Sequence, residues 1–395
     1  MDYHLTREQL LTDLHTAYLD ARRHKRNKSY QLYFEAHAEE NLESLCDELW
    51  NRRYQPLPST CFIITDPKKR EVFAAQFRDR IVHHLYFNYT HEMLERTFIA
   101  DTYSCIKKRG THYGIRRLER HIRRESKNYT RPCYVLKMDI QGYFMHINRE
   151  RLLQITLRQL RKMSSHNYAR GAGMWREYVD FEFLEYLTRI IIMLDPTIDC
   201  RRKGTALDWY GLPDEKSLFK SDEGCGLPIG NLTSQLFSNV YLNEFDQFMK
   251  RQMGCRHYGR YVDDFFVVST DRRWLRSLRK PIADFLKTAL GLEVNETKTV
   301  INDVRFGIEF LGAYLKPRRR YVSNRCLRRM KRKVPTLREV RSGEQMRSRL
   351  NSFLGILSHY RCYGLRKKMY FNLQEVYQYG YYLRGMKKFV LFGNH

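Results

Sequence analysis

The chain has 395 residues, more than one ordinary hydrophobic core accommodates, and 43% of them are hydrophobic, so we expect two or three subdomains around a shared interior. Its 71 Lys and Arg residues outnumber 44 Asp and Glu residues, which gives a net charge of +27. The positive side chains repel one another unless a bound polyanion neutralises them. A solubilising surface or a binder of anionic membranes would also be basic. The basic residues alternate with 28 Tyr and 22 Phe, which can stack on bases, and this favours nucleic acid.

The sequence predicts neither a membrane partner nor an oxidising compartment. No apolar run approaches the roughly 20 residues of a membrane span, and the start MDYHLTREQLL lacks the apolar stretch of a signal peptide. The nine cysteines are odd in number and form no CxxC pair. This pattern favours reduced thiols and a cytoplasmic location, without a zinc site.

The first half of the chain predicts mainly helices. Residues 1–55 are expected to form two helices joined by a basic link, ARRHKRNKSY, and the second helix, EAHAEENLESLCDELWNRRY, has apolar residues at helical spacing. CFIIT then predicts an extended segment, PKKREVFAAQFRDR carries clustered basic residues, and a helix in IVHHLYFNYTHEMLERTF and a strongly basic helix in GIRRLERHIRRESKN follow. YVLKMDI predicts an apolar strand that ends at Asp139, and residues 164–226 predict one apolar helix, FEFLEYLTRIIIML, and a long polar insertion loop.

The second half predicts a helix, a hairpin and a basic helical end. GLPIGNLTSQLF opens a helix in which Leu232, Leu236 and Val240 follow i, i+4 spacing. A hairpin is expected over residues 257–269. After it we expect a helix in RRWLRSLRKPIADFLKTAL, a strand that ends at Lys298, and a strand in IEFLGAYL. From Lys316 onward the chain is basic and is expected to be helical. We find no internal repeat.

The hairpin HYGRYVDDFFVVS places two adjacent carboxylates, Asp263 and Asp264, between aromatic and β-branched residues. If the strand ending at Asp139 lies beside it in one antiparallel sheet, three carboxylates converge at one edge. Clustered carboxylates repel one another unless a cation neutralises them, and Mg²⁺ suits such hard oxygen ligands. Two such ions would stabilise an attacking 3′-hydroxyl and a leaving pyrophosphate. Asp-Asp is also ordinary turn chemistry, but the flanking Tyr261 and FFVV predict a buried hairpin and favour a metal site.

These residues resemble a reverse transcriptase over about residues 56–365. YVDD resembles the central hairpin signature of that family, VLKMDIQGYF its first metal-binding motif, and GLPIGNLTSQLFSNVYLNEFD, LGLEVNETKT and EFLGAYL its later blocks, in the correct order. The resemblance implies an α/β right-hand polymerase with fingers, a palm built on an antiparallel sheet, and a helical thumb. It divides the chain into a helical amino-terminal extension (1–55), fingers (56–130), a palm with interleaved fingers and an insertion near 164–226 (131–315), and a helical thumb and tail (316–395).

The subfamily is suggested by three segments. GLPIGNLTSQ, KSLF at Lys216 to Phe219, and REVFAAQFRDRIVHH resemble the reverse transcriptases of diversity-generating retroelements. Many relatives have Gln where this chain has Ile229, and Pro where it has Gln235. A retron-like or phage-defence reverse transcriptase is the enzymatic alternative. The non-enzymatic alternative is an RNA-binding scaffold that keeps the polymerase fold.

The resemblance also implies roles for individual residues. Asp139, Asp263 and Asp264 would bind metal together with the Ile140 carbonyl, and Phe144 would be the steric gate that excludes ribose. Arg70, with Lys68 or Lys69, would clamp the triphosphate, and Lys298 would lie near the leaving pyrophosphate. Ile229 and Gln235 would lie beside the incoming nucleotide. Because Ile229 lacks the side-chain amide of the more usual Gln, we expect weaker discrimination between bases.

The implied activity is RNA-directed DNA synthesis from dNTPs with two Mg²⁺ ions. The subfamily resemblance implies that a template RNA is copied into cDNA that is mutagenised at adenines, and that a target gene is thereby diversified. It also implies a small, basic, pentameric partner, the accessory variability determinant protein, and a bacterial or phage-encoded enzyme. The basic segments KPRRR, RRMKRK and GLRKKM of the thumb are expected to contact phosphates of the template and cDNA.

Overall fold

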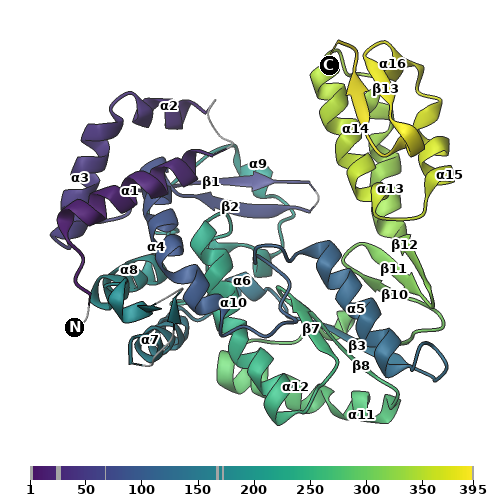
Figure 1. The fold of residues 1–395 in the computed structure, drawn as a ribbon, viewed down its shortest axis with the longest axis horizontal. Helices are drawn as coiled ribbons and strands as arrows, with labels where there is room; N and C mark the ends of the chain where they lie inside the picture. Colours follow the sequence, from purple (N-terminus) through teal and green to yellow (C-terminus); the bar gives the residue numbers. More distant parts are fainter. Residues whose placement is uncertain (1–2, 24–27, 67, 166–168, 171–172, 394–395) are drawn as a thin grey trace. The chain divides into compact units, whose positions relative to one another are not determined.

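The chain folds into two compact units in a computed structural model that describes residues 3–23, 28–66, 68–165, 169–170 and 173–393 (Figure 1). The first unit comprises Met1–Gly110, Lys137–Phe266 and Ser277–Thr299, and the second comprises Thr111–Leu136, Val267–Arg276 and Val300–His395. Residues 24–27 of the expected basic link, and 166–168 and 171–172 of the expected insertion, lie outside the described residues. No helix in the described part of the chain is both long and apolar enough to cross a membrane.

Helix α4 is the centre of the helical part of the first unit. It contacts α1, α8 and α10, and its Ile81, Val82 and Leu85 are buried (Figure 1). The helices of this unit are α1 (Arg7–Arg22), α2 (Ser29–Glu35), α3 (Ala38–Trp50), α4 (Phe77–Glu95), α6 (Tyr143–His146), α7 (Arg149–Ser165), α8 (Phe181–Met193), α9 (Ala206–Trp209), α10 (Leu232–Gln247) and α12 (Arg279–Leu290). The expectation of two amino-terminal helices was wrong, because His37 leaves the helical conformation (φ −133°, ψ 46°) and separates α2 from α3.

A three-stranded sheet of order β2-β1-β6 lies in the same unit. Strand β1 (Ser59–Ile64) is antiparallel to β2 (Arg70–Ala74) and parallel to the short β6 (Cys200–Arg202). Residues 200–220, expected to be part of a polar loop, instead fold onto β1 and β2. The buried carboxylate of Glu71 is the reason: it accepts hydrogen bonds from Trp209 Nε1 (2.7 Å), Ser217 Oγ (3.1 Å) and Leu218 N (2.6 Å), and a buried carboxylate requires such partners.

A four-stranded sheet of order β7-β8-β3-β9 carries the predicted hairpin. Its strands are β3 (Tyr134–Asp139), β7 (Tyr258–Tyr261), β8 (Asp264–Ser269) and β9 (Val300–Asp303), and short strands β4 (Ala169–Arg170) and β5 (Gly173–Met174) pair elsewhere. Phe265, Phe266, Val267 and Val268 of β8 are all buried, as the hairpin reading predicted. The expected strand ending at Lys298 was wrong: Glu296–Lys298 form a 3₁₀ turn, and the strand begins at Val300.

The second unit combines helices with two small antiparallel sheets. Its elements are α5 (Thr111–Glu125), α11 (Arg272–Ser277), β10 (Ile308–Phe310), β11 (Ala313–Lys316), β12 (Arg319–Val322), α13 (Asn324–Lys333), α14 (Gly343–Ser358), α15 (Tyr363–Arg366), α16 (Gln374–Tyr377), β13 (Gly380–Tyr382) and β14 (Phe389–Leu391). The expectation that the chain is helical from Lys316 onward was wrong, because β12, β13 and β14 lie in this part. Gly380 permits the close pairing of β13 with β14, because a Cβ there would lie 1.9 Å from the Val390 carbonyl oxygen.

A buried ion pair fixes β7 to α10. Arg260 Nε and Nη2 donate to the two carboxylate oxygens of Asp246 at 2.8 and 2.7 Å, and both side chains are 0% exposed. Asp246 also accepts from the hydroxyls of Thr102 (2.9 Å) and Tyr258 (2.5 Å). Both charges are removed from water but fully hydrogen-bonded, so removing one partner would leave the other charge buried without compensation.

We therefore predict that Asp246→Asn lowers the free energy of unfolding by about 3–5 kcal/mol. The matched control is Glu185→Gln, which breaks the exposed ion pair between Glu185 and Arg161 and should cost about 0–1 kcal/mol. Chemical denaturation of both variants measures the difference. Equal losses in the two variants would contradict the role given to the buried pair.

Candidate functional site

Three carboxylates meet at one end of the β3, β7 and β8 strands. Asp139 is the last residue of β3 and is buried, Asp263 lies in the turn between β7 and β8, and Asp264 is the first residue of β8. The backbone joins them, since the amide of Ile140 donates to the carbonyl of Asp263 at 3.3 Å. The expectation that the strand-end Asp139 lies beside the hairpin is therefore confirmed, since β3 neighbours β8 in the sheet.

The turn itself is held in an unusual conformation. Val262 has φ +55°, a left-handed conformation that is rare for a β-branched residue. Arg260 Nη1 donates to the Val262 carbonyl at 3.0 Å, and the Val262 amide donates to Ser104 Oγ at 3.1 Å. The buried ion pair of Arg260 thus also determines where the two turn carboxylates lie.

Burial and mutual repulsion disfavour the ionised carboxyls. Burial raises the pKa of Asp263 to about 6, with further increases from the charges of Asp139 and Asp264 and a decrease from Lys298. Burial also raises the pKa of Asp264, against which Lys137, Lys298 and Lys68 act. Each direction is expected for carboxylates that share a desolvated site.

Lys298 supplies the cation that Asp139 contacts. Its ammonium forms an ion pair with Asp139 Oδ2, although the lysine side chain is 54% exposed. The backbone holds Asp139 from the other side, where its carbonyl accepts from Asn295 N at 2.8 Å. Among the residues that the structure describes, no group of three or more His, Cys, Asp or Glu side chains is arranged to hold a metal ion.

Sequence reasoning missed Lys137 as a member of this site. Lys137 precedes Asp139 by two residues on β3, so the two side chains share one face of the strand. This spacing was the signal that could have identified it. For the fingers lysines, Lys68 acts electrostatically on Asp264, whereas Lys69 Nζ donates to the Tyr210 carbonyl at 2.6 Å.

Two of the predicted nucleotide-binding residues lie together. Phe144 of α6 and Ile229 are both partly buried against one apolar cluster, made of Cys61, Phe73, Met145 and Leu218. The Ile229 carbonyl accepts from Phe73 N at 2.9 Å, which ties this residue to β2. Phe144 and Ile229 thus share one apolar cluster, and their nucleotide-binding roles stay predictions.

The two remaining residues that were predicted to bind the nucleotide, Arg70 and Gln235, are exposed. Arg70 is the first residue of β2 and pairs with Ile64 of β1. Gln235 lies on the first turn of α10. These positions leave both side chains accessible to a ligand, and their nucleotide-binding roles stay predictions.

Comparison with known proteins identifies the family. Residues 68–315, more than half of the chain, match the profile of the family described as reverse transcriptase (RNA-dependent DNA polymerase). The chain belongs to the reverse transcriptase family. The expected right-hand polymerase fold and the expected RNA-directed DNA polymerase activity are confirmed at this level, and the three carboxylates lie inside the matched region.

Individual relatives are distant. Protein YkfC of Escherichia coli (strain K12) is 25% identical over 315 residues, covering 71% of this reverse transcriptase and 72% of YkfC. Apo telomerase from Candida tropicalis is 14% identical with a TM-score of 0.46, over 78% of this chain and 53% of its own. Telomerase from Candida albicans in complex with a TWJ fragment of telomeric RNA is 12% identical with a TM-score of 0.45, over 83% and 61%. The chain therefore spans less than two thirds of these telomerases.

The raised pKa of Asp263 predicts a pH-dependent cost to stability. Its folded-state pKa of about 6 exceeds its ordinary value of 3.8, so the folded chain binds this proton more tightly than the unfolded chain, and stability falls as pH rises between these values. In the presence of a chelator, Asp263→Asn should stabilise the protein by about 1 kcal/mol near pH 8, because solvent partly screens the charge of the Asp263 carboxylate. Near pH 4 the substitution should not change the stability. Thermal unfolding at the two pH values measures this. An identical shift at both would show that ionisation of Asp263 is not the cause.

Proposed function

We propose that this reverse transcriptase copies a template RNA into cDNA at the edge formed by Asp139, Asp263 and Asp264. The convergence of these three carboxylates on one sheet edge, two of them with raised pKa values, is the observation that carries the proposal. A protein that needed only a stable hairpin would gain nothing from carboxyl groups that burial and repulsion both disfavour. Their retention is explained by a cationic ligand.

The donor set fits Mg²⁺. The carboxylates offer hard oxygen atoms, which Mg²⁺ prefers together with water and phosphate oxygens, and the contact of Asp139 with the Lys298 ammonium shows that this edge accommodates positive charge. Asp139, Asp263, Asp264 and the Ile140 carbonyl would hold two ions. Bound there, the ions supply stabilisation of the attacking 3′-hydroxyl and of the leaving pyrophosphate.

The surrounding side chains suit the binding of a dNTP. Arg70 presents an exposed guanidinium, which suits a triphosphate, and the charge of Lys68 already acts on the carboxylate edge. Lys298 would move from Asp139 to the departing phosphates and could donate a proton there. Phe144 is held by its apolar cluster and would exclude a 2′-hydroxyl by steric clash.

A primer-extension assay tests this activity. Asp263→Asn should reduce dNTP incorporation on a primed RNA template by about 1000-fold or more, because it removes one charged ligand of the reaction centre, and a chelator should abolish incorporation by the unmodified protein. The matched control is Asp284→Asn on the exposed surface of α12, which should leave incorporation unchanged. Full activity of Asp263→Asn would refute the assignment of the site.

We further propose that copying is error-prone at template adenines, as in diversity-generating retroelements. Ile229 supports this, because its side chain has no hydrogen-bonding atoms and packs with Phe144 on the same apolar cluster. A substrate that is not anchored by a hydrogen bond adopts a looser pose, so the free-energy gap between correct and incorrect pairs shrinks. The basic, pentameric accessory variability determinant protein is the partner proposed with this role.

Fidelity measurements test the role of Ile229. Ile229→Gln should lower the misincorporation frequency opposite template adenine by roughly 2- to 10-fold, the value of one net hydrogen bond. Ile229→Leu keeps the apolar character and is the control, for which we expect no change. An unchanged error spectrum in Ile229→Gln would remove this residue from the account of mutagenesis.

A retron-like or phage-defence role is the alternative that the genome can decide. A template repeat and a variable repeat near the gene, differing mainly at adenines, would support the diversifying role. A dedicated structured RNA gene without such repeats would support the alternative. Either outcome leaves the proposed carboxylate chemistry unaffected.

A further inference from the structure

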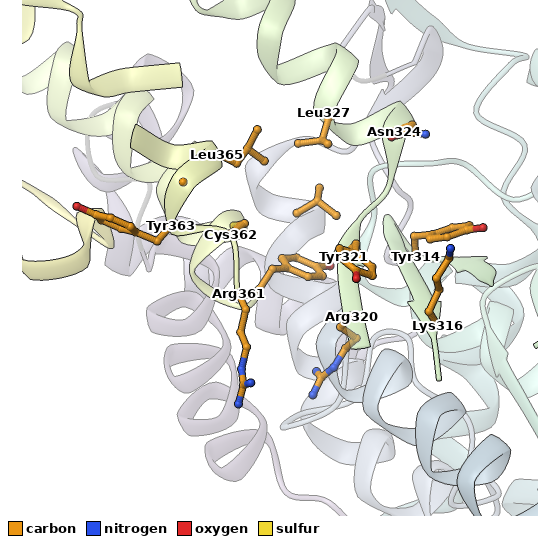
Figure 2. Close-up of a pocket in the computed structure, with 13 residues that line it drawn as sticks. Tyr314, Lys316, Arg320, Tyr321, Asn324, Leu327, Arg361, Cys362, Tyr363 and Leu365 are labelled. Atoms are coloured by element: carbon orange, nitrogen blue, oxygen red, sulfur yellow. The ribbon is translucent and has the colours of Figure 1, made fainter. Parts of the chain in front are cut away.

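The second unit contains a cavity of about 580 Å³ whose lining includes none of the three carboxylates (Figure 2). Its walls come from β11, β12, the start of α13 and residues 360–365. The lining residues used below are Tyr314, Arg320, Tyr321, Leu327, Arg361 and Leu365. The volume lies within the range of about 300–1,000 Å³ that is typical of small-molecule sites.

The cavity has one cationic end and one apolar end. The side chains of Arg320 and Arg361 extend in the same direction, Leu327 and Leu365 lie on the opposite side, and Tyr321 lies between the two pairs (Figure 2). A ligand that fits this arrangement carries an aromatic or apolar group at one end and an anionic group at the other. A nucleotide, with its base and its phosphate, has this polarity.

The cationic end is positioned by other contacts within the same unit. Arg320 Nε pairs with Glu119 of α5 at 3.2 Å, which restrains the arginine side chain. Tyr321 pairs with Tyr314 across the β11–β12 ladder, and the Tyr314 hydroxyl donates to the Phe306 carbonyl. Tyr321 is nevertheless 41% exposed, so part of its ring is available for stacking.

We propose that this cavity binds one unpaired nucleotide of single-stranded RNA. The base stacks on Tyr321 and faces Leu327 and Leu365, and the adjoining phosphate contacts Arg320 and Arg361. A base in a duplex cannot enter, because both of its faces are already stacked, whereas the splayed bases of single strands stack on aromatic side chains. The identity of the strand as template RNA rests on the proposed function, but the preference for unpaired RNA does not.

Binding of two matched probes tests the preference. One probe is a fluorescein-labelled oligoribonucleotide without self-complementarity, and the other is the same strand annealed to its full DNA complement. By fluorescence anisotropy, Tyr321→Leu should weaken binding of the single strand by roughly 5- to 150-fold, the range for one stacked base, and leave the hybrid unchanged. Tyr321→Phe keeps the stacking face and should bind the single strand as the unmodified protein does.

The matched control is Tyr381→Leu, which removes an equally exposed tyrosine (42%) of the second unit that does not line the cavity. Arg361→Gln provides an independent variant, compared with Arg384→Gln, and should weaken single-strand binding more than its control does. Equal weakening of single strand and hybrid would show a duplex-backbone surface and overturn the proposal, as would an effect of Tyr321→Leu no larger than that of Tyr381→Leu. Both outcomes are measured without primer extension, so they are distinct from failure of the proposed polymerase activity.

Discussion

Holding like charges together at one sheet edge is the constraint on which the candidate site depends. Asp263 and Asp264 are adjacent in the turn, and Asp139 is brought beside them by the pairing of β3 with β8. Burial and repulsion raise the pKa of both turn carboxyls. The fold tolerates this unfavourable local charge because the rest of the sheet is stabilised elsewhere, and carboxyls perturbed in this way mark a candidate functional site.

A buried ion pair, Arg260 with Asp246, supplies part of the stabilisation of the sheet. The charges of Arg260 and Asp246 offset each other in a fully buried, bidentate contact. The same guanidinium donates to the carbonyl of Val262, a residue in the left-handed conformation. One buried cation therefore connects α10, β7 and the turn. Lys298, by contrast, is exposed and contacts Asp139, so the Arg260 cation is removed from water whereas the Lys298 cation is not.

Local patterns predicted the parts of the fold that depend on local chemistry. The apolar strand before Asp139 and the aromatic, β-branched flanks of the hairpin predicted two buried strands, and both formed. The segment folded by Glu71 could not be predicted, because the partners of this carboxylate lie more than a hundred residues away and its burial is a tertiary effect. That Lys68 acts on Asp264 while Lys69 does not could not be predicted either, since Lys69 is hydrogen-bonded to the Tyr210 carbonyl. The family was predictable from its motifs, whereas the diversifying role depends on Ile229 and stays a proposal.

We propose that the three carboxylates form one site for divalent cations. Electron paramagnetic resonance titration with Mn²⁺, in the presence of primed RNA template and a non-incorporable dNTP analogue, tests it most directly. We expect two bound Mn²⁺ ions per chain in the unmodified protein and the loss of at least one in Asp139→Asn. The same stoichiometry and affinity in both proteins would contradict it.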